Sequence, residues 1–338
     1  MPRKVLVLGG TDFVGPAVVA AALAYGDDVT IFHRGQTGAA PDGVRAIHGD
    51  RTNAADLDLL TSEHWDIVVD AWSRAPRVVL ESARALEPHA ARYVYISTIS
   101  VYAEAHDGVI TEASMTVAAR PDAVATEYSA DKRGAELAIE SVFGTERSLF
   151  ARPGLILGPR ENIGRLPWWL RRVAAGGTVL APAPQDLAVQ YIDARDLAAF
   201  ALETTLNGPV NVLSRPGHTT MAEVLALCHE VTDSTATFTW VDADFLLAHK
   251  VEPWTELPIW VPPVGDMANF YTCDSSLALR SGLARRSARA TVADTWSWLR
   301  DIPDWTQVVT ANRSRVGMDP EREAALLAAW ADQPPAAL

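Results

Sequence analysis

Three side chains of this sequence have the types and the spacing for proton exchange with a substrate oxygen. Tyr128 and Lys132 stand at the two ends of the run YSADK, and residues four apart share one face of a helix. A lysine ammonium beside a phenol favours the phenolate and so lowers a pKa that is ordinarily about 10. A tyrosine tuned in this way exchanges a proton near neutral pH. Thr98 follows an apolar run, and its hydroxyl would hold the substrate oxygen.

A glycine-rich stretch at the start of the chain has the pattern of a diphosphate site. Residues 4–15 read KVLVLGGTDFVG, which is an apolar run short enough for a buried strand, then a glycine turn, then the opening of a helix. Gly9 permits the turn, Gly10 lets a backbone approach a diphosphate, and Gly15 lets the helix pack on the strand. The N–H groups and the dipole of the helix N-terminus favour an anion.

Short strands and helices alternate through the first half of the chain. We expect strands at residues 5–8, 28–33, 44–48, 66–71, 93–97 and 147–151, and helices at 16–25, 54–60, 76–86 and 127–143. This alternation predicts an α/β fold with a doubly wound parallel sheet. Ligands bind such sheets at the carboxyl ends of the strands. Those ends carry Gly9-Gly10, His33-Arg34, Asp50, Ala71-Trp72 and Ser97-Thr98.

After residue 152 the regular alternation stops, and proline, glycine and tryptophan become frequent. A chain of 338 residues suits two domains. We expect residues 1–152 plus about 188–214 to form a dinucleotide-binding domain. Residues 153–187 and 215–332 would form a smaller, discontinuous substrate domain, and 333–338 a poorly packed tail. Helices are expected at 220–231, 292–300 and 321–330, a strand and a helix capped by Asp193 at 190–202, and irregular structure over a pocket at 236–263.

The composition narrows the partners and the compartment. The formal net charge of −13 argues against nonspecific binding to nucleic acid or to an anionic membrane. The hydrophobic fraction of 49% allows a large core. Cys228 and Cys273 lack C-x-x-C spacing, and the histidines lack metal-ligand spacing. The apolar runs are broken by charge before membrane-spanning length. We therefore expect a cytoplasmic protein with reduced thiols and no metal, which acts on a small molecule. The sequence does not fix the oligomeric state, and a homodimer is one option.

Five motifs together resemble those of the extended and atypical short-chain dehydrogenases/reductases, also called the NAD-dependent epimerase/dehydratase family. They are GGTDFVG, YISTISVY, YSADK, ARPGLILGPR and VQYIDARDLA, and they extend over nearly the whole chain. The resemblance implies a Rossmann sheet with Thr98, Tyr128 and Lys132 as catalytic residues. It also implies that Asp50 meets the adenine and that Pro153 lies beside the nicotinamide.

Two positions depart from the family's pattern. Asp12 stands where the motif has its central glycine, as other residues do in atypical members. Leu155 stands where many sugar-nucleotide epimerases have an asparagine that touches the diphosphate, which argues against a nucleotide-sugar substrate without excluding it.

The end of the second strand indicates the coenzyme. An acidic residue there would bind the ribose 2′-OH and favour NAD, but the chain reads His33-Arg34-Gly35. A guanidinium suits a 2′-phosphate, so Arg34 favours NADP, with NAD kept as the alternative. The residues expected to contact the coenzyme are Gly9, Gly10, Thr11, Asp12, Phe13, Val14, Gly15, His33, Arg34, Asp50, Arg51, Ala71, Trp72, Ser97, Tyr128, Lys132 and Pro153.

The sequence thus predicts an oxidoreductase that transfers a hydride between NAD(P) and a carbonyl or alcohol of a small, partly apolar substrate. One alternative is a sugar-nucleotide epimerase or dehydratase, in which tightly held NAD is reduced and reoxidised within each turnover. The other is a noncatalytic protein that binds a dinucleotide for regulation or binds RNA. Intact Tyr128 and Lys132 and the acidic net charge speak against this last reading.

Overall fold

The computed structural model describes residues 1–36, 38–103, 108–307 and 316–333. The chain divides into two compact units. The first comprises Met1–Ile156, Tyr191–Arg215 and Cys273–Arg285, and the second Leu157–Gln190, Pro216–Thr272 and Arg286–Leu338. This division differs from the expected one chiefly in Cys273–Arg285, which belongs to the first unit. The expected tail at 333–338 lies outside the described residues except for Gln333.

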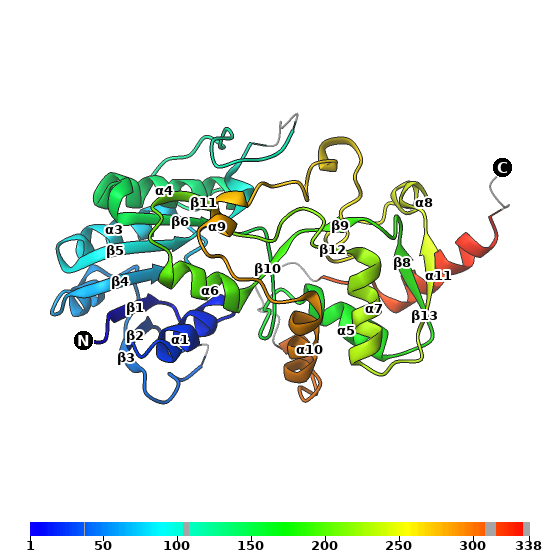
Figure 1. Ribbon diagram of the computed structural model, residues 1–338, viewed down its shortest axis with the longest axis horizontal. Helices are drawn as coiled ribbons and strands as arrows, with labels where there is room; N and C mark the ends of the chain where they lie inside the picture. The colour runs from blue at the N-terminus through cyan, green and yellow to red at the C-terminus, as the bar shows by residue number, and fades with distance from the viewer. Residues whose placement is uncertain (37, 104–107, 308–315, 334–338) are drawn as a thin grey trace. The chain divides into compact units, whose positions relative to one another are not determined.

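A seven-stranded sheet forms the centre of the first unit (Figure 1), with the strand order β11-β6-β5-β4-β1-β2-β3. The strands are β1 (Lys4–Leu8), β2 (Asp28–His33), β3 (Arg45–His48), β4 (Trp65–Asp70), β5 (Ala90–Ile96), β6 (Ser148–Arg152) and β11 (Gly208–Asn211). Every neighbouring pair is parallel. The order reverses at β1, so the predicted doubly wound Rossmann fold is confirmed, and the first six strands lie within a few residues of their expected positions.

Helices cover both faces of this sheet. One face packs on α1 (Val14–Ala24), α6 (Ala194–Glu203) and α9 (Ser276–Arg280), and the other on α2 (Ala54–Leu57), α3 (Pro76–Leu86) and α4 (Tyr128–Phe143). Successive residues of β1 alternate between these faces, since Val5 and Val7 belong to the first apolar cluster and Leu6 and Leu8 to the second. A strand buried on both faces reads as a continuous apolar run, which is why β1 was legible in the sequence.

Shorter elements complete the first unit. They are the 3₁₀ turns η1 (Asp58–Leu60), η2 (Glu87–His89), η3 (Ile99–Val101) and η4 (Thr145–Arg147), and the pair β7 (Leu155–Leu157) and β10 (Tyr191–Asp193), of which β7 ends at the boundary of the unit. The carboxylate of Asp193 accepts a hydrogen bond of 2.9 Å from the N–H of Arg195. The expected strand and capped helix at 190–202 are therefore confirmed.

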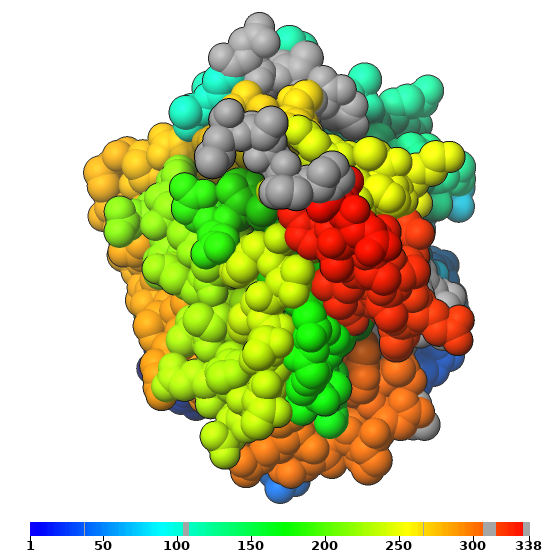
Figure 2. Space-filling model, turned by 90° about the vertical axis from the view of Figure 1, so that its right-hand side faces the viewer, coloured from blue at the N-terminus to red at the C-terminus, as the bar shows by residue number. Residues whose placement is uncertain are grey.

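The second unit contains helices and two small strand pairings. Its elements are α5 (Arg165–Ala174), β8 (Thr178–Pro182), β9 (Ala188–Val189), β12 (Thr219–Thr220), α7 (Met221–Val231), β13 (Thr237–Val241), α8 (Ala243–Ala248), η5 (Gly265–Met267), α10 (Ala288–Leu299), η6 (Trp305–Gln307) and α11 (Pro320–Ala331). The strand pairings are β12 with β9 and β13 with β8. Helix α11, red in Figure 2, lies on the surface of this unit. The three helices expected in this part of the chain are present as α7, α10 and α11.

The expectation of irregular structure at 236–263 is wrong in its first half. Thr237–Val241 forms β13, which pairs in parallel with β8, and α8 follows directly. The partner strand lies far away in the sequence, so local pattern gave no sign of the pairing. Trp169 and Trp260 are fully buried, and their indole N–H groups donate to the carbonyls of Pro258 and Ala183. Core packing accounts for these two side chains.

Within the described residues, no helix has the length and apolarity needed to cross a membrane. No disulfide joins Cys228 to Cys273, and both side chains are buried.

Candidate active site

The turn between β1 and α1 has the geometry of a close-approach site. Gly9 and Gly10 have φ angles of +116° and +84°, which favour glycine. A Cβ on Gly10 would lie 2.7 Å from Cγ2 of Ile31, and one on Gly15 would lie 2.7 Å from Cα of Gly10. Gly15 therefore lets α1 pack on the turn itself, rather than on the strand as the sequence suggested.

The N-terminus of α1 is suited to an anion. Phe13, at its N-cap, makes no side-chain capping hydrogen bond, and the first turn holds no acidic residue. The first N–H groups of a helix have no partner within the helix, so they can bind a diphosphate. Thr11 and the exposed Asp12 lie in the turn before them, while Val14 is buried in the first turn of the helix.

The ends of β2 and β3 bring together His33, Arg34 and Asp50. The ring of His33 is 7% exposed, and neither of its nitrogens has a hydrogen-bond partner within the described part of the chain. Burial, and then the neighbouring His48 at 4.8 Å between ring centroids, lower the pKa of His33. The imidazole is therefore neutral at pH 7, with one donor and one acceptor to offer a ligand. Arg34 is exposed.

Asp50 has a local role that the sequence did not reveal. Its carboxylate accepts hydrogen bonds from the N–H and the hydroxyl of Thr52, at 2.9 and 2.8 Å. These two bonds, and to a lesser degree the charges of Arg34 and Arg51, hold the pKa of Asp50 below its ordinary value. Asp50 thus shapes the turn after β3 and places a negative charge near Arg34.

Arg51, expected at the coenzyme, is bound to the protein instead. Its guanidinium donates to both oxygens of Asp70 at 2.7 Å and to the hydroxyl of Ser82. Burial would favour the neutral acid, but the charge and hydrogen bonds of Arg51 hold the pKa of Asp70 below its usual range. Asp70 also accepts from the hydroxyl of Tyr93 and the N–H of Trp72. The side chain of Arg51 is therefore held away from a coenzyme phosphate by this ion pair.

Lys132 lies at the carboxyl ends of β4 and β5. Its ammonium donates to the carbonyls of Trp72 and Ile96, at 2.8 and 2.7 Å, and its side chain is buried. The same ammonium lies 4.6 Å from the centre of the Tyr95 ring, a distance typical of a cation–π contact. Lys132 is thus fixed beside the strand end that carries Thr98.

Tyr128 is the first residue of α4, one helical turn before Lys132, and is half exposed. The carboxylate of Asp131 binds the N–H and the hydroxyl of Thr126 at 2.8 Å, which fixes the chain just before Tyr128. Burial, then the charges of Asp70 and Tyr128, raise the pKa of Tyr95 well above its usual range. Tyr95 therefore stays a neutral hydroxyl, and its ring contacts Lys132.

Ser97 and Thr98 have different environments at the end of β5. The hydroxyl of Thr98 is bonded to Ser100, through its Oγ at 3.2 Å and its N–H at 3.1 Å. The hydroxyl of Ser97 donates to the buried carboxylate of Glu136 at 2.6 Å. Glu136 is also bound by the guanidinium of Arg152, at 2.9 and 2.7 Å. Ser97 therefore belongs to a buried network that joins β5, α4 and β6.

The predicted site residues are brought together at one edge of the sheet. The glycine turn follows β1, His33 and Arg34 end β2, Asp50 follows β3, and exposed Ala71 and half-buried Trp72 follow β4. Pro153 follows β6, and its carbonyl accepts from the N–H of Ile99 at 2.9 Å. The structure separates from this set the side chains of Arg51 and Ser97, which bind within the protein.

Four buried side chains behind the edge were missed in the sequence: Asp70, Tyr95, Glu136 and Arg152. Glu136 follows Lys132 by one more helical turn, and this spacing was the one available signal. Asp70 and Tyr95 lie within strands that are otherwise apolar, so pattern alone did not separate them from core residues.

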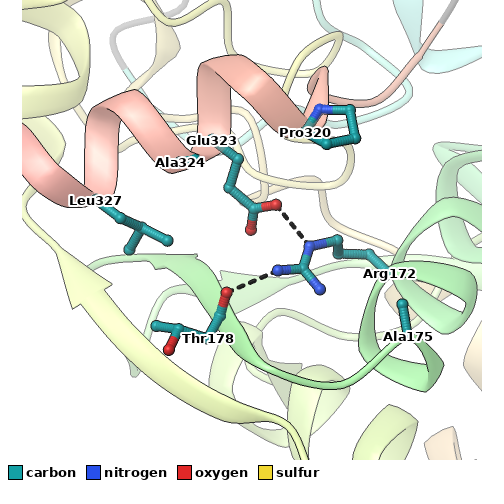
Figure 3. A pocket seen from close by; sticks show the side chains of 7 residues that line it. All are labelled: Arg172, Ala175, Thr178, Pro320, Glu323, Ala324 and Leu327. Carbon is teal, nitrogen blue, oxygen red and sulfur yellow. Dashed lines mark hydrogen bonds and ion pairs between the residues drawn. The ribbon is translucent and has the colours of Figure 1, made fainter.

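Two surface pockets among the described residues have linings that include none of the predicted site residues. Figure 3 shows one of about 230 Å³ in the second unit, where Arg172 of α5 and Glu323 of α11 form an ion pair of 2.6 Å. Arg172 also donates to the carbonyl of Thr178, and the second oxygen of Glu323 accepts from the N–H of Leu180. These groups join α11 to α5 and β8. A pocket of about 390 Å³ in the first unit is lined by residues including Glu112, Arg133 and Arg152.

The comparisons with known proteins show the family to which the chain belongs. The model of the NAD-dependent epimerase/dehydratase family matches residues 5–211. The chain belongs to this family, and it is an enzyme of the short-chain dehydrogenase/reductase type that uses a nicotinamide coenzyme. The resemblance drawn from the five motifs is therefore confirmed.

One curated relative is the 2′-dehydrokanamycin reductase of Streptomyces kanamyceticus. It is 29% identical over 215 residues, and the match covers 60% of this chain and 58% of the relative. The chain thus spans well under two thirds of that relative's length.

Three solved structures share the fold. The Bordetella bronchiseptica enzyme WbmG in complex with NAD is 18% identical, with a TM-score of 0.66 over 93% of this chain and 98% of its own. A UDP-glucose 4-epimerase of Thermotoga maritima, with UDP-glucose, is 17% identical, and its TM-score is 0.65 over 88% of this chain and 98% of its own. The UDP-glucose 4-epimerase of Thermus thermophilus, with NAD, is 20% identical, and its TM-score is 0.61 over 88% of this chain and 99% of its own.

Proposed function

We propose that this enzyme uses NADPH to reduce a ketone of a small molecule to an alcohol. Thr98 holds the carbonyl oxygen, Tyr128 gives it a proton, and Lys132 stabilises the phenolate of Tyr128 and binds a ribose of the coenzyme. The arrangement of Tyr128 and Lys132 carries this proposal. Tyr128 begins α4 with an exposed phenol, and the buried ammonium of Lys132 follows one helical turn later. The substrate can therefore meet the phenol at one end of this turn while the coenzyme meets the ammonium at the other.

The residues of the first unit fit a dinucleotide. A Cβ would fill the glycine turn, the N-terminus of α1 has no capping side chain, and His33 offers two unpartnered ring nitrogens within the described chain. These groups suit the diphosphate and the adenosine ribose. When bound, the coenzyme supplies the hydride. The family uses NAD, and Arg34 supports a preference for the 2′-phosphate of NADP.

The substrate class is supported by the reductase relative, which is named for 2′-dehydrokanamycin. A net charge of −13 would attract such a cationic substrate. The expectation of a partly apolar ketone stays a prediction beside it. The family's epimerases support the alternative, a sugar-nucleotide epimerase or dehydratase. Coenzyme that stays bound through purification, with no net use of NADPH, would favour that alternative.

The main test is Tyr128→Phe, assayed with NADPH and a panel of ketones that includes keto amino sugars and alicyclic ketones. This change removes one hydroxyl and keeps the ring, so coenzyme binding should persist. The chemical step should fall by roughly 10²–10⁴, the usual contribution of a positioned general acid. Thr98→Val should cost less, and Lys132→Met should weaken both rate and coenzyme binding. Tyr25→Phe removes a hydroxyl that is similarly exposed in the same unit and should change neither. Wild-type turnover by Tyr128→Phe would reject the assignment.

The coenzyme preference is tested at Arg34. We expect the wild-type enzyme to bind NADPH more tightly than NADH, and Arg34→Ala to remove most of the difference, roughly 1–3 kcal/mol for bonds to a charged group. Coenzyme fluorescence titration measures both affinities. Arg84→Ala, at an exposed position of α3, is the control and should keep the preference. Equal wild-type affinities for the two coenzymes would reject it.

A further inference from the structure

A chain of hydrogen bonds links the buried Arg51 to Lys132. It begins at the ion pair in which Arg51 binds both oxygens of Asp70 at 2.7 Å. Oδ1 of Asp70 accepts the N–H of Trp72 at 2.9 Å. The carbonyl of Trp72 then accepts the ammonium of Lys132 at 2.8 Å. The main-chain N–H and carbonyl of Trp72 therefore connect the buried Arg51–Asp70 ion pair to Lys132.

Tyr95 joins this chain at the same carbonyl. Its hydroxyl donates to the oxygen of Trp72 at 2.7 Å, so that oxygen accepts both Tyr95 and Lys132. The ring of Tyr95 also lies beneath the ammonium of Lys132, at 4.6 Å from its centre. One tyrosine thus contacts Lys132 directly and fixes one of its acceptors.

The side chain of Trp72 is held as well. The guanidinium of Arg51 lies 5.0 Å from the centre of the indole, and the indole N–H donates to the carbonyl of Ala75 at 3.2 Å. The side chain of Trp72 is therefore held by Arg51 and Ala75, and its main chain by Asp70. An acceptor fixed in this way restricts where the long side chain of Lys132 can place its ammonium.

We propose that Arg51, Asp70 and Tyr95 are positioning residues, which hold the ammonium of Lys132, through the peptide of Trp72, in place for the ribose next to the nicotinamide. This role rests on the proposed function, in which Lys132 binds a ribose of the coenzyme. Because Lys132 lies one helical turn from Tyr128, which gives the proton to the substrate, that ribose is the one next to the nicotinamide. Arg51 then serves the coenzyme without touching it, and Arg34 is left as the arginine for the 2′-phosphate.

The role separates the two halves of the coenzyme, and this gives its test. NADPH contains the nicotinamide ribose, whereas adenosine 2′,5′-bisphosphate lacks it. Tyr95→Phe removes only the hydroxyl that fixes the carbonyl of Trp72. It should weaken the binding of NADPH by roughly three- to tenfold, the usual range for one hydrogen bond, and leave the affinity for adenosine 2′,5′-bisphosphate unchanged. Isothermal titration calorimetry of the full-length enzyme measures both.

A double-mutant cycle shows whether the effect passes through Lys132. In the Lys132→Met background, Tyr95→Phe should have no further effect on NADPH, because the group that it positions is gone. Arg51→Lys keeps the charge but cannot bind both oxygens of Asp70, and it should show the same selective loss of NADPH affinity. Tyr271→Phe is the matched control, since Tyr271 is also buried and its hydroxyl also donates to a carbonyl, that of Ile259.

Three results would overturn the proposal. Equal losses for NADPH and the bisphosphate would mean that Tyr95 supports the fold in general. A loss that persists in Lys132→Met would mean that Tyr95 acts without the lysine, and unchanged NADPH affinity in Tyr95→Phe would mean that it does nothing there. Failure of the wild-type enzyme to bind either molecule would reject the proposed function itself, and the positioning role with it.

Discussion

The two units each contain an arginine paired with a buried carboxylate, and the pairs differ in what they hold. In the first unit Arg51 binds both oxygens of Asp70, and the side chains are 8% and 0% exposed. In the second unit Arg172 binds one oxygen of Glu323, and the side chains are 19% and 5% exposed. The first pair is deeper and bidentate, so its two charges depend more on each other.

Each carboxylate also accepts a main-chain N–H, and the residue that donates it differs between the two pairs. Asp70 accepts Trp72, whose carbonyl leads to Lys132. Glu323 accepts Leu180 of β8, which fixes α11 on the surface of the second unit. The same chemistry thus serves the active-site edge in one case and the attachment of a terminal helix in the other. On the proposed role of Lys132, the residue that donates this main-chain N–H decides whether function depends on the pair.

The largest difference between the pairs should appear when the carboxylate of the first is neutralised. Asp70→Asn leaves the guanidinium of Arg51 buried without a counter-ion, and breaking a buried pair in this way costs about 3–5 kcal/mol. Urea denaturation measures the loss in the free energy of unfolding. Asp122→Asn, which neutralises the exposed partner of Arg120 in the same unit, is the control and should leave stability unchanged.

The same variant also tests whether the two ion pairs differ in their contribution to stability. If Asp70→Asn lost no more stability than Asp122→Asn, the ion pair would contribute little to the fold, and the contrast between the two units would fail. Native-state hydrogen exchange would show where the loss falls, because amides of β4 and the Trp72 loop should open first.

The sheet and the glycine turn could be predicted because their signals are local. The strand β1 is an apolar run followed directly by Gly9 and Gly10, and each residue of the pattern has its meaning within a dozen positions. The edge that gathers Thr98 and Lys132 followed from the general rule for parallel sheets. These parts of the prediction depend on neighbouring residues.

Arg51 shows what local patterns cannot give. It follows Asp50 at the end of β3, where a basic residue reads as a phosphate ligand. Its actual partner, Asp70, is nineteen positions away on another strand, and nothing in either neighbourhood says which way the guanidinium turns. The strand β13 was missed for the same reason, because its partner β8 is distant in sequence. Side-chain direction and nonlocal pairing are set by the assembled core.

The buried carboxyl group of Glu161, in the second unit, should make the stability of the protein depend on pH. Glu161 is 1% exposed, and its oxygens accept the N–H groups of Arg165 and Leu166 at the start of α5. Burial raises the pKa of Glu161 to about 7, against the opposing effects of Arg165 and the two N–H groups. The folded chain then keeps a proton that the unfolded chain has lost above its ordinary pKa of about 4.5.

Raising the pH between these two values should therefore favour unfolding. The stability of the wild type relative to Glu161→Gln should fall by up to about 3 kcal/mol between pH 5 and pH 8. Urea denaturation of both proteins across this range measures the difference, and the subtraction removes the other titrating groups. A gap that stays constant with pH, or widens in favour of the wild type, would mean that the N–H groups keep Glu161 ionised.

The smallest effect is expected at the second pair of the comparison. Glu323→Gln should cost about 1 kcal/mol, the value of an ordinary hydrogen bond, because Arg172 is partly solvated and keeps the carbonyls of Gly176 and Thr178. The loss should be confined to α11 and β8, where hydrogen exchange should quicken, while NADPH affinity should not change. Weaker coenzyme binding in Glu323→Gln, or a stability loss as large as that of Asp70→Asn, would show that the attachment of α11 reaches the active site, and the distinction between the two pairs would be wrong.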